Sequence, residues 1–231
     1  MLQVENLNTY YGESHILRGL NFRGEPGEIA GLIGRNGMGK TTFLKSVVGL
    51  LKPREGSIHF NGVDITRLRP EARARLGIAY VPQGREIFPQ LSVHENLLLG
   101  LEAHPERPKK YEEDVFELFP VLKDMLKRKG GVLSGGQQQQ LAIARAMVGK
   151  PKLLLLDEPT EGIQPSIIIE IEKILWKLKE RGDVGILLVE QYLEFAWRLS
   201  DRYYVIEKGE FTAEGAAEGE CDDTVLERLT A

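Results

Sequence analysis

Residues 34–42 combine glycines, a lysine and two threonines at the spacing of a phosphate-binding loop, G-x-x-x-x-G-K-[ST]. In such a loop, backbone N–H groups curl around an anion, the lysine reaches the β- and γ-phosphates of a nucleotide, and the following hydroxyl ligates Mg²⁺. The pattern therefore predicts a nucleotide site. The residues assigned to it are Gly34, Arg35, Asn36, Gly37, Met38, Gly39, Lys40, Thr41 and Thr42, with Thr41 as the Mg²⁺ ligand.

The segments on either side of this loop have the order that its chemistry requires. Residues 28–33 are apolar enough for a buried strand, and residues 41–51 place apolar side chains on one face of a helix. A helix that begins near Gly39 directs its unpaired N–H groups and the positive end of its dipole at the phosphates. The alternative is a glycine-rich turn before an ordinary helix, but the strand, loop and helix order favours a nucleotide site.

A second acidic motif follows the leucine run 153–156. An apolar strand that ends in Asp157 delivers a carboxylate to the edge of the sheet where ligands bind in open α/β folds. Asp157 would hold Mg²⁺ directly or through water. Glu158 would lie beside the γ-phosphate and orient or deprotonate the attacking water. An acidic helix cap is the alternative, but the distance from the phosphate loop favours the catalytic interpretation.

Two further polar segments are only weak evidence of function when each is considered alone. Gln83 ends a predicted strand, where its amide could touch both Mg²⁺ and the attacking water; otherwise it is a loop glutamine. Residues 133–137 read Leu-Ser-Gly-Gly-Gln, in which Ser134 can cap a following helix and two glycines leave its N–H groups bare. This segment predicts either a capped helix or a second anion site at a helix N-terminus.

Composition limits the classes of protein to which the chain can belong. Its 231 residues suffice for one large domain or two small ones, and a net charge of −4 gives no basic footprint for nucleic acid. Cys221 is the only cysteine, which excludes an internal disulfide, and the four histidines lack metal-ligand spacing. Without a secretory signal or a bilayer-length apolar run, we expect a cytosolic protein that reaches a membrane only by docking onto another chain.

The remaining pattern predicts how the sites are positioned. Alternating apolar strands and helices after residue 133 predict a mostly parallel sheet, while short strands in residues 1–27 and 57–60 predict an antiparallel sheet beside the phosphate loop. Helical periodicity predicts a helical subdomain at about 90–136, interrupted at 104–108. Residues 203–211 predict a terminal hairpin with Lys208-Gly209 at its turn. We expect a single α/β domain over residues 1–231.

In this order the phosphate loop, Gln83, the 133–137 motif and Asp157-Glu158 resemble the ATP-binding domain of ABC transporters, from Met1 to the hairpin near Phe211. The resemblance implies a P-loop ATPase core that binds ATP and Mg²⁺, and two such domains facing each other head to tail. Each ATP then lies between the loop of one domain and the signature of the other, here Ser134, Gly135, Gly136 and Gln137. It also implies that Tyr11 stacks on adenine, although an ordinary strand tyrosine is the alternative.

Two departures from the family pattern stand out. Gln191 occupies the position where most members have a histidine that contacts the γ-phosphate. A neutral amide can sense phosphate but cannot titrate, which leaves Glu158 as the favoured base. After the catalytic pair the chain reads Glu161-Gly-Ile-Gln164-Pro where Ala-Leu-Asp is common, so contacts across a dimer should differ in detail.

The Val-Glu-Gln run that ends at Gln191 resembles the branched-chain amino-acid importer group. So does the run Val-Pro-Gln-Gly-Arg-Glu-Ile-Phe at 81–88. Residues 158–167 and the four glutamines 137–140 are most similar to the ATP-binding subunit of urea importers. The expected function is therefore ATP hydrolysis that powers uptake of a small polar solute, urea first and branched-chain amino acids as the alternative. Catalysis would rest on positioning and charge stabilisation by Lys40, Mg²⁺ and the partner's signature helix.

The same resemblance implies partners and two rival functions. We expect a second ATPase subunit, identical or related, and membrane permease subunits that dock in a groove near residues 85–88 at the inner face of the membrane. An extracytoplasmic solute-binding protein would take part indirectly, and no nucleic acid is expected. A DNA-repair relative would need long coiled coils, for which the stretch between Lys40 and Leu133 leaves no room. A small-molecule kinase would use residues 133–137 only as a helix cap.

Overall fold

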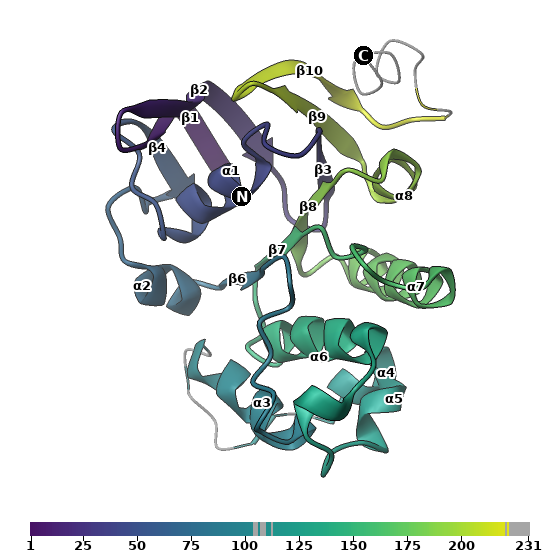
Figure 1. Ribbon diagram of the computed structural model, residues 1–231. Coiled ribbons are helices and arrows are strands. Elements are labelled where there is room, and N and C mark those ends of the chain that lie inside the picture. The colour runs from purple at the N-terminus through teal and green to yellow at the C-terminus, as the bar shows by residue number, and fades with distance from the viewer. Residues whose placement is uncertain (104–105, 107–109, 112, 220, 222–231) are drawn as a thin grey trace.

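The computed structural model describes residues 1–103, 106, 110–111, 113–219 and 221, and its strands form two sheets (Figure 1). The four-stranded sheet is antiparallel in the order β2-β1-β4-β5. In the six-stranded sheet, of order β10-β9-β3-β8-β7-β6, all neighbours are parallel except β10 and β9. The predicted mostly parallel sheet with an N-terminal antiparallel sheet is confirmed. The strands are β1 Leu2–Tyr11, β2 Ser14–Gly24, β3 Ile29–Ile33, β4 Glu55–Phe60, β5 Val63–Asp64, β6 Ile78–Val81, β7 Leu153–Asp157, β8 Gly185–Glu190, β9 Arg202–Glu207 and β10 Glu210–Ala216.

The larger sheet lies in the middle of the molecule, because its central strands are buried on both faces. Every residue of β3, β7 and β8 is buried, as expected for parallel strands covered on each side. Leu153 and Leu155 of β7 pack toward helix α1 (Lys40–Val48) and the antiparallel sheet. Leu154 and Leu156 pack toward the opposite face, against helices α6 (Gly135–Met147) and α7 (Pro165–Arg181).

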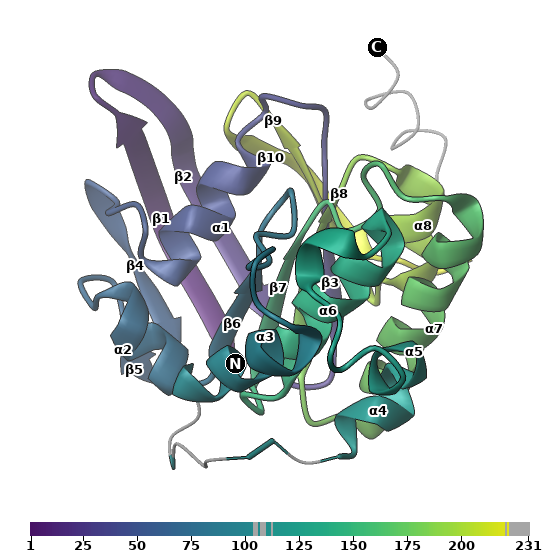
Figure 2. The same cartoon turned by 60° about the horizontal axis from the view of Figure 1, so that its bottom comes forward.

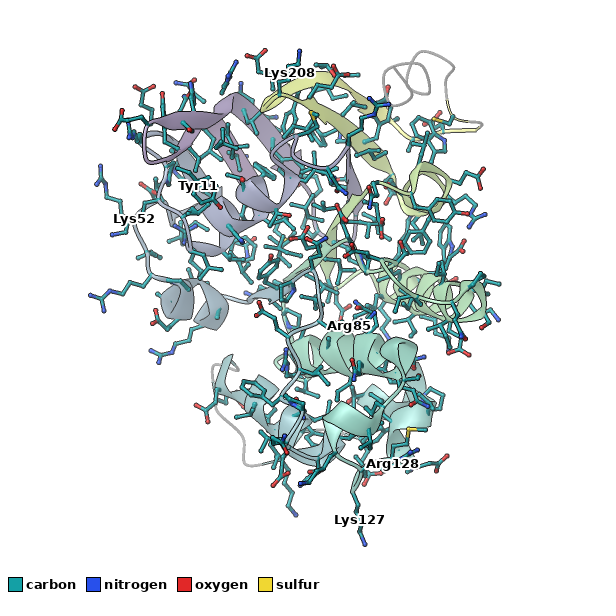
Figure 3. All side chains as sticks on the ribbon, in the orientation of Figure 1. Tyr11, Lys52, Arg85, Lys127, Arg128 and Lys208 are labelled. Atoms are coloured by element: carbon teal, nitrogen blue, oxygen red, sulfur yellow. The ribbon has the colours of Figure 1, made fainter. Side chains whose placement is uncertain are left out.

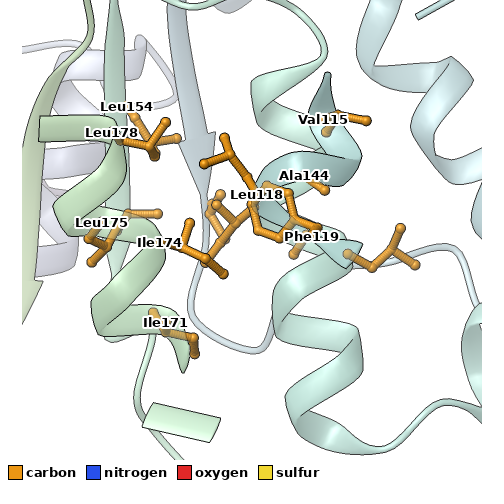
Figure 4. Close-up of a cluster of buried hydrophobic side chains, with 14 of the residues drawn as sticks. Val115, Leu118, Phe119, Ala144, Leu154, Ile171, Ile174, Leu175 and Leu178 are labelled. Carbon is orange, nitrogen blue, oxygen red and sulfur yellow. The ribbon is translucent and has the colours of Figure 1, made fainter. Parts of the chain in front are cut away.

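Short helices gather on this second face and form the helical region (Figure 2). They are α3 Val93–Gly100, η1 Leu101–Ala103, α4 Val115–Leu118, α5 Pro120–Lys123 and η2 Gly130–Val132. Their apolar side chains converge with those of α6 and α7 on Leu154 of β7 (Figure 4). Helix α6 therefore continues the helical region beyond residue 136. The predicted interruption at 104–108 lies, apart from Glu106, outside the described residues.

Some local elements differ from the sequence-based expectations. The first two strands are long, 10 and 11 residues, where short strands and turns were expected. Bulges lie in β1 between Val4 and Leu7 and between Leu7 and Thr9. They break the alternation of buried and exposed residues, so the sequence pattern of one long strand looks like that of several short strands. Helices α2 (Pro70–Arg75) and α8 (Leu193–Leu199) were not predicted, because six or seven residues are too few to show a helical period. Across the described residues, no helix has the length and apolar character needed to cross a membrane.

The turn of the terminal hairpin braces the phosphate loop. Lys208 and Gly209 both have left-handed backbones, with φ of 48° and 83°. The N–H of Gly209 donates to the carbonyl of Met38 at 3.0 Å, and its own carbonyl accepts the N–H of Arg18 at 2.9 Å. A hairpin about 170 residues further along the chain thus fixes the middle of the loop that follows β3.

We predict that Gly209→Ala destabilises the fold by roughly 2–5 kcal/mol, because a Cβ there meets the backbone carbonyl of Ile16 as well as a disfavoured φ. Gly62→Ala is the matched control. Gly62 has a φ of 78° in the turn Asn61-Gly62, but an added Cβ meets nothing within 4 Å, so it should cost only about 1–2 kcal/mol. Urea unfolding of the two variants measures the difference. Equal losses of stability in Gly209→Ala and Gly62→Ala would show that Gly209 is not in close contact with the backbone of β2.

Candidate nucleotide-binding site

The phosphate loop lies between β3 and α1, at the carboxyl edge of the parallel sheet. Helix α1 begins at Lys40 with Gly39 as its N-cap residue, at φ 112°, close to the predicted start. Gly34 passes the backbone of β9 so closely that an added Cβ would lie 2.6 Å from the carbonyl oxygen of Ile206. This position admits only glycine, and that close approach holds the first half of the loop against the sheet.

Lys40 occupies the centre of the loop. Its Nζ donates to the carbonyl oxygens of Gly34 at 2.7 Å and Arg35 at 3.0 Å. It also forms an ion pair with Glu158 Oε1 at 3.0 Å, and both side chains are only 4% exposed. An ammonium has three donors, so the loop carbonyls and the carboxylate use all of them. A phosphate that binds Lys40 must therefore compete with Glu158.

Glu158 is held in place by contacts from three directions. Its backbone N–H donates to the Val189 carbonyl of β8 at 2.9 Å, and its φ of 47° is unusual for a residue other than glycine. Its Oε2 lies 3.5 Å from Gln83 Nε2 and 3.3 Å from Gln191 Nε2, and both amides donate to it. A left-handed non-glycine backbone costs of order 1–3 kcal/mol and persists where surrounding contacts over-determine it. The predicted base, amide and sensor are thus brought together with Lys40.

Asp157 and Thr41 form an oxygen-rich pair beside this group. The Thr41 hydroxyl donates to Asp157 Oδ1 at 3.2 Å, and the Tyr80 hydroxyl donates to Oδ2 at 3.0 Å. Burial raises the pKa of the Asp157 carboxyl, while the hydrogen bonds from Tyr80 and Thr41 oppose that shift. Carboxylate, hydroxyl and amide oxygens are ligands that suit Mg²⁺, so Asp157, Thr41 and Gln83 fit the predicted metal.

A pocket of about 370 Å³ connects these residues to the predicted adenine platform. Tyr11, labelled in Figure 3, ends β1 and is 45% exposed, so a face of its ring is available to a ligand. Stacking of adenine on Tyr11 stays a prediction. The pocket is lined by Tyr11, Ile16, Asn36, Gly37, Gly39, Lys40, Thr41, Thr42, Gln83 and Glu158.

The signature residues lie outside this pocket. Ser134 caps α6: its Oγ accepts the N–H of Gln137 at 3.3 Å, while Gln137 Oε1 accepts the N–H of Ser134 at 3.0 Å. Ser134 is exposed, and none of residues 134–137 lines the pocket. The chain therefore presents a loop site and a separate capped helix end, each open to solvent.

The structure adds to the site a buried carboxylate to which sequence reasoning gave no role. Glu190, at the end of β8, is 1% exposed. Its carboxylate accepts the N–H and hydroxyl of Thr160 at 3.1 and 2.8 Å, and the N–H groups of Gln191 and Tyr192 at 3.2 and 3.4 Å. Burial raises the pKa of Glu190 above its ordinary value, and the hydrogen bonds from Thr160 and Tyr192 offset part of that rise. The one signal in the sequence is an acidic residue that closes an apolar strand directly before Gln191.

Comparisons with known proteins agree with this geometry. Residues 17–161 match the family model described as ABC transporter. The chain is 42% identical to the high-affinity branched-chain amino acid transport ATP-binding protein BraG of Pseudomonas aeruginosa, over 90% of each chain. It is 38% identical to a probable branched-chain amino acid transport ATP-binding protein, LivF, of Archaeoglobus fulgidus, over 99% and 98%. It is also 34% identical to the lipopolysaccharide export system ATP-binding protein LptB of Escherichia coli, over 99% and 95%.

Solved structures give the same result. An ATP-binding cassette of an ABC transporter in its ADP conformation is 32% identical with a TM-score of 0.82, covering 94% of this chain and 91% of that one. A dimeric bacterial ABC transporter cassette is 26% identical with a TM-score of 0.83, covering 95% and 100%. The chain belongs to the ABC transporter family, as an ATP-binding subunit whose ATP hydrolysis is coupled to transport.

We predict that Lys40→Met weakens ATP binding at least tenfold, because a charge-assisted hydrogen bond contributes about 1.5–3 kcal/mol. Methionine keeps the length and apolar volume of the stem. Lys52→Met is the control, since Lys52 is exposed and lies beyond the end of α1. Isothermal titration calorimetry gives both affinities. Affinity unchanged in Lys40→Met, with circular dichroism like that of the unaltered protein, would remove Lys40 from the phosphate site.

Proposed function

We propose that the chain is the ATP-hydrolysing subunit of an importer for branched-chain amino acids. The observation that carries this proposal is the 42% identity to BraG over 90% of each chain, with the 38% identity to LivF in support. The lipopolysaccharide export protein is a more distant match at 34% identity. The phosphate loop and its acidic pair account for the energy source, and the relatives support the class of solute.

Urea, the first expectation from the sequence, is less well supported. That reading rested on residues 158–167 and on the glutamines at 137–140, all of which belong to the ATPase machinery or the helix that follows it. Neither of the two branched-chain amino acid transport relatives is named for urea. Since the solute binds elsewhere in a transporter, these residues cannot report on it directly. Urea therefore becomes the second candidate.

The residues of the site have distinct roles in hydrolysis. Lys40 binds the β- and γ-phosphates, which releases Glu158 from its ion pair to act as the base toward water. Gln83 and Gln191 hold the freed carboxylate and sense the γ-phosphate, since both already donate to Glu158 Oε2. Thr41, Asp157 and Gln83 would hold Mg²⁺, which would neutralise charge on the phosphates.

Hydrolysis requires a second ATPase subunit, in our proposal. The pocket lacks residues 134–137 of its own chain, and Ser134 faces solvent on a capped helix end. A head-to-tail partner, identical or related, supplies that helix end to the γ-phosphate. Both halves of such a composite site are present in this chain.

A groove of about 650 Å³ provides the surface for a permease subunit. It is lined by residues of α2, β6, α3 and α6, and by Phe88, the one residue of the predicted stretch 85–88 in its lining. Leu50, Phe88 and Leu99 line it and are each at least 40% exposed, which suits an apolar helix of a membrane partner. Through this contact the subunit is held at the inner face of the membrane, and a solute-binding protein takes part on the other side.

Uptake of labelled solutes tests the proposal in cells that lack this chain. We expect leucine uptake to be lost, urea uptake to be unchanged, and leucine uptake to return with the unaltered protein and with Lys52→Met but not with Lys40→Met. Lost urea uptake with intact leucine uptake would establish the second candidate. If neither solute is affected while ATP still binds, the importer assignment fails and the nucleotide site stands.

A further inference from the structure

Tyr80 reaches the nucleotide site from β6, the strand that also leads to Gln83. It lies on β6, paired in register with Leu155 of β7, and its hydroxyl extends along the neighbouring strand to Asp157 Oδ2 at 3.0 Å. The Thr41 hydroxyl contacts the other oxygen, Oδ1, at 3.2 Å. Asp157 is 1% exposed, so these two hydroxyls are donors to a carboxylate that has almost no contact with water.

The hydroxyl of Tyr80 therefore decides how the Asp157 carboxylate is turned. A buried carboxylate without hydrogen bonds is costly, so each oxygen stays with its donor. With Oδ2 occupied by Tyr80, Oδ1 remains beside Thr41 Oγ1, where two oxygen ligands for one cation must be. Without the Tyr80 hydroxyl, Oδ2 has lost its donor, and the hydrogen bond from Thr41 alone no longer fixes how the carboxylate is turned.

The phenol is suited to act only as a donor. Its partner there, the Asp157 carboxylate at 3.0 Å, is an acceptor, so the hydroxyl is the donor of this hydrogen bond. Its ring packs against the apolar cluster between the two sheets, which keeps the side chain in position. Tyr80 also lines the groove of about 650 Å³, so the same side chain contacts both the groove and the Asp157 carboxylate.

We propose that Tyr80 is a positioning residue for Mg²⁺: its hydroxyl holds the Asp157 carboxylate with Oδ1 beside Thr41, and so sets the affinity of the ATP site for the metal. This inference rests on the proposed assignment of Asp157 and Thr41 as Mg²⁺ ligands. It gives a role to a residue that touches neither nucleotide nor metal. Packing alone would require the ring of Tyr80 but not its hydroxyl.

Tyr80→Phe separates these two possibilities, because it keeps the ring and removes the hydroxyl. ATP affinity of the full chain is measured by calorimetry at a series of free Mg²⁺ concentrations and in EDTA. We expect affinity in EDTA to stay within about twofold of the unaltered protein. Mg²⁺ increases the affinity for ATP, and the free Mg²⁺ concentration that gives half of this increase should be about tenfold higher in Tyr80→Phe. This difference is equivalent to about 1.4 kcal/mol.

Tyr204→Phe is the matched control. Its hydroxyl is buried and donates to the Arg23 carbonyl at 3.0 Å, on strands away from the metal ligands, so its Mg²⁺ dependence should be unchanged. An unaltered Mg²⁺ dependence in Tyr80→Phe, or a loss of ATP affinity in EDTA, would overturn the positioning role. Asp157→Asn tests whether Asp157 is a Mg²⁺ ligand, which is the assignment on which the role of Tyr80 rests. If that variant keeps the normal Mg²⁺ dependence, the metal assignment fails, whatever Tyr80→Phe shows.

Discussion

The buried ion pair between Lys40 and Glu158 is the interaction on which the rest of the site depends. Its 3.0 Å contact joins the loop after β3 to the end of β7 in a region where neither side chain is more than 4% exposed. Removing one member of such a pair leaves an uncompensated charge, typically at a cost of 3–5 kcal/mol. The pair therefore keeps Glu158 in a left-handed backbone, with φ of 47°, and away from water. In the proposed mechanism, a phosphate that binds Lys40 replaces the Glu158 carboxylate and frees it to act as the base.

The order of strands brings every part of this arrangement to one edge. From β9 through β3, β8 and β7 to β6, five parallel neighbours end there, and each contributes one feature. In that order the features are the turn that braces the loop, the loop itself, Gln191, the acidic pair and Gln83. Glu190 joins two of these ends by accepting hydrogen bonds from both Thr160 and Gln191. Charge at the centre and hydrogen bonds between neighbouring strand ends hold the site together.

The main residues of the site could be predicted from local motifs and from the family resemblance, whereas the contacts that Tyr80 and Gly209 make could not. The loop at 34–42 and the strand that ends in Asp157 follow local patterns, so their elements were found within a few residues of their observed bounds. Tyr80 and Gly209 act across 77 and about 170 residues of sequence, where no local pattern points to the partner. The length of β1 could not be predicted either, because its bulges break the alternation of buried and exposed residues. The solute could not be predicted from residues 158–167 and 137–140, because these residues belong to the ATPase machinery or the helix that follows it.

The central claim is that each ATP site is completed by the signature of another chain, and mixing two inactive variants tests it most directly. Lys40→Met lacks a working loop, and Ser134→Arg lacks a working signature. In a head-to-tail pair of these two chains, one composite site is intact and the other is doubly impaired. We predict that each variant alone is inactive and that ATP hydrolysis returns when they are mixed. Hydrolysis by Ser134→Arg alone, or a mixture that forms dimers but stays inactive, would contradict the account.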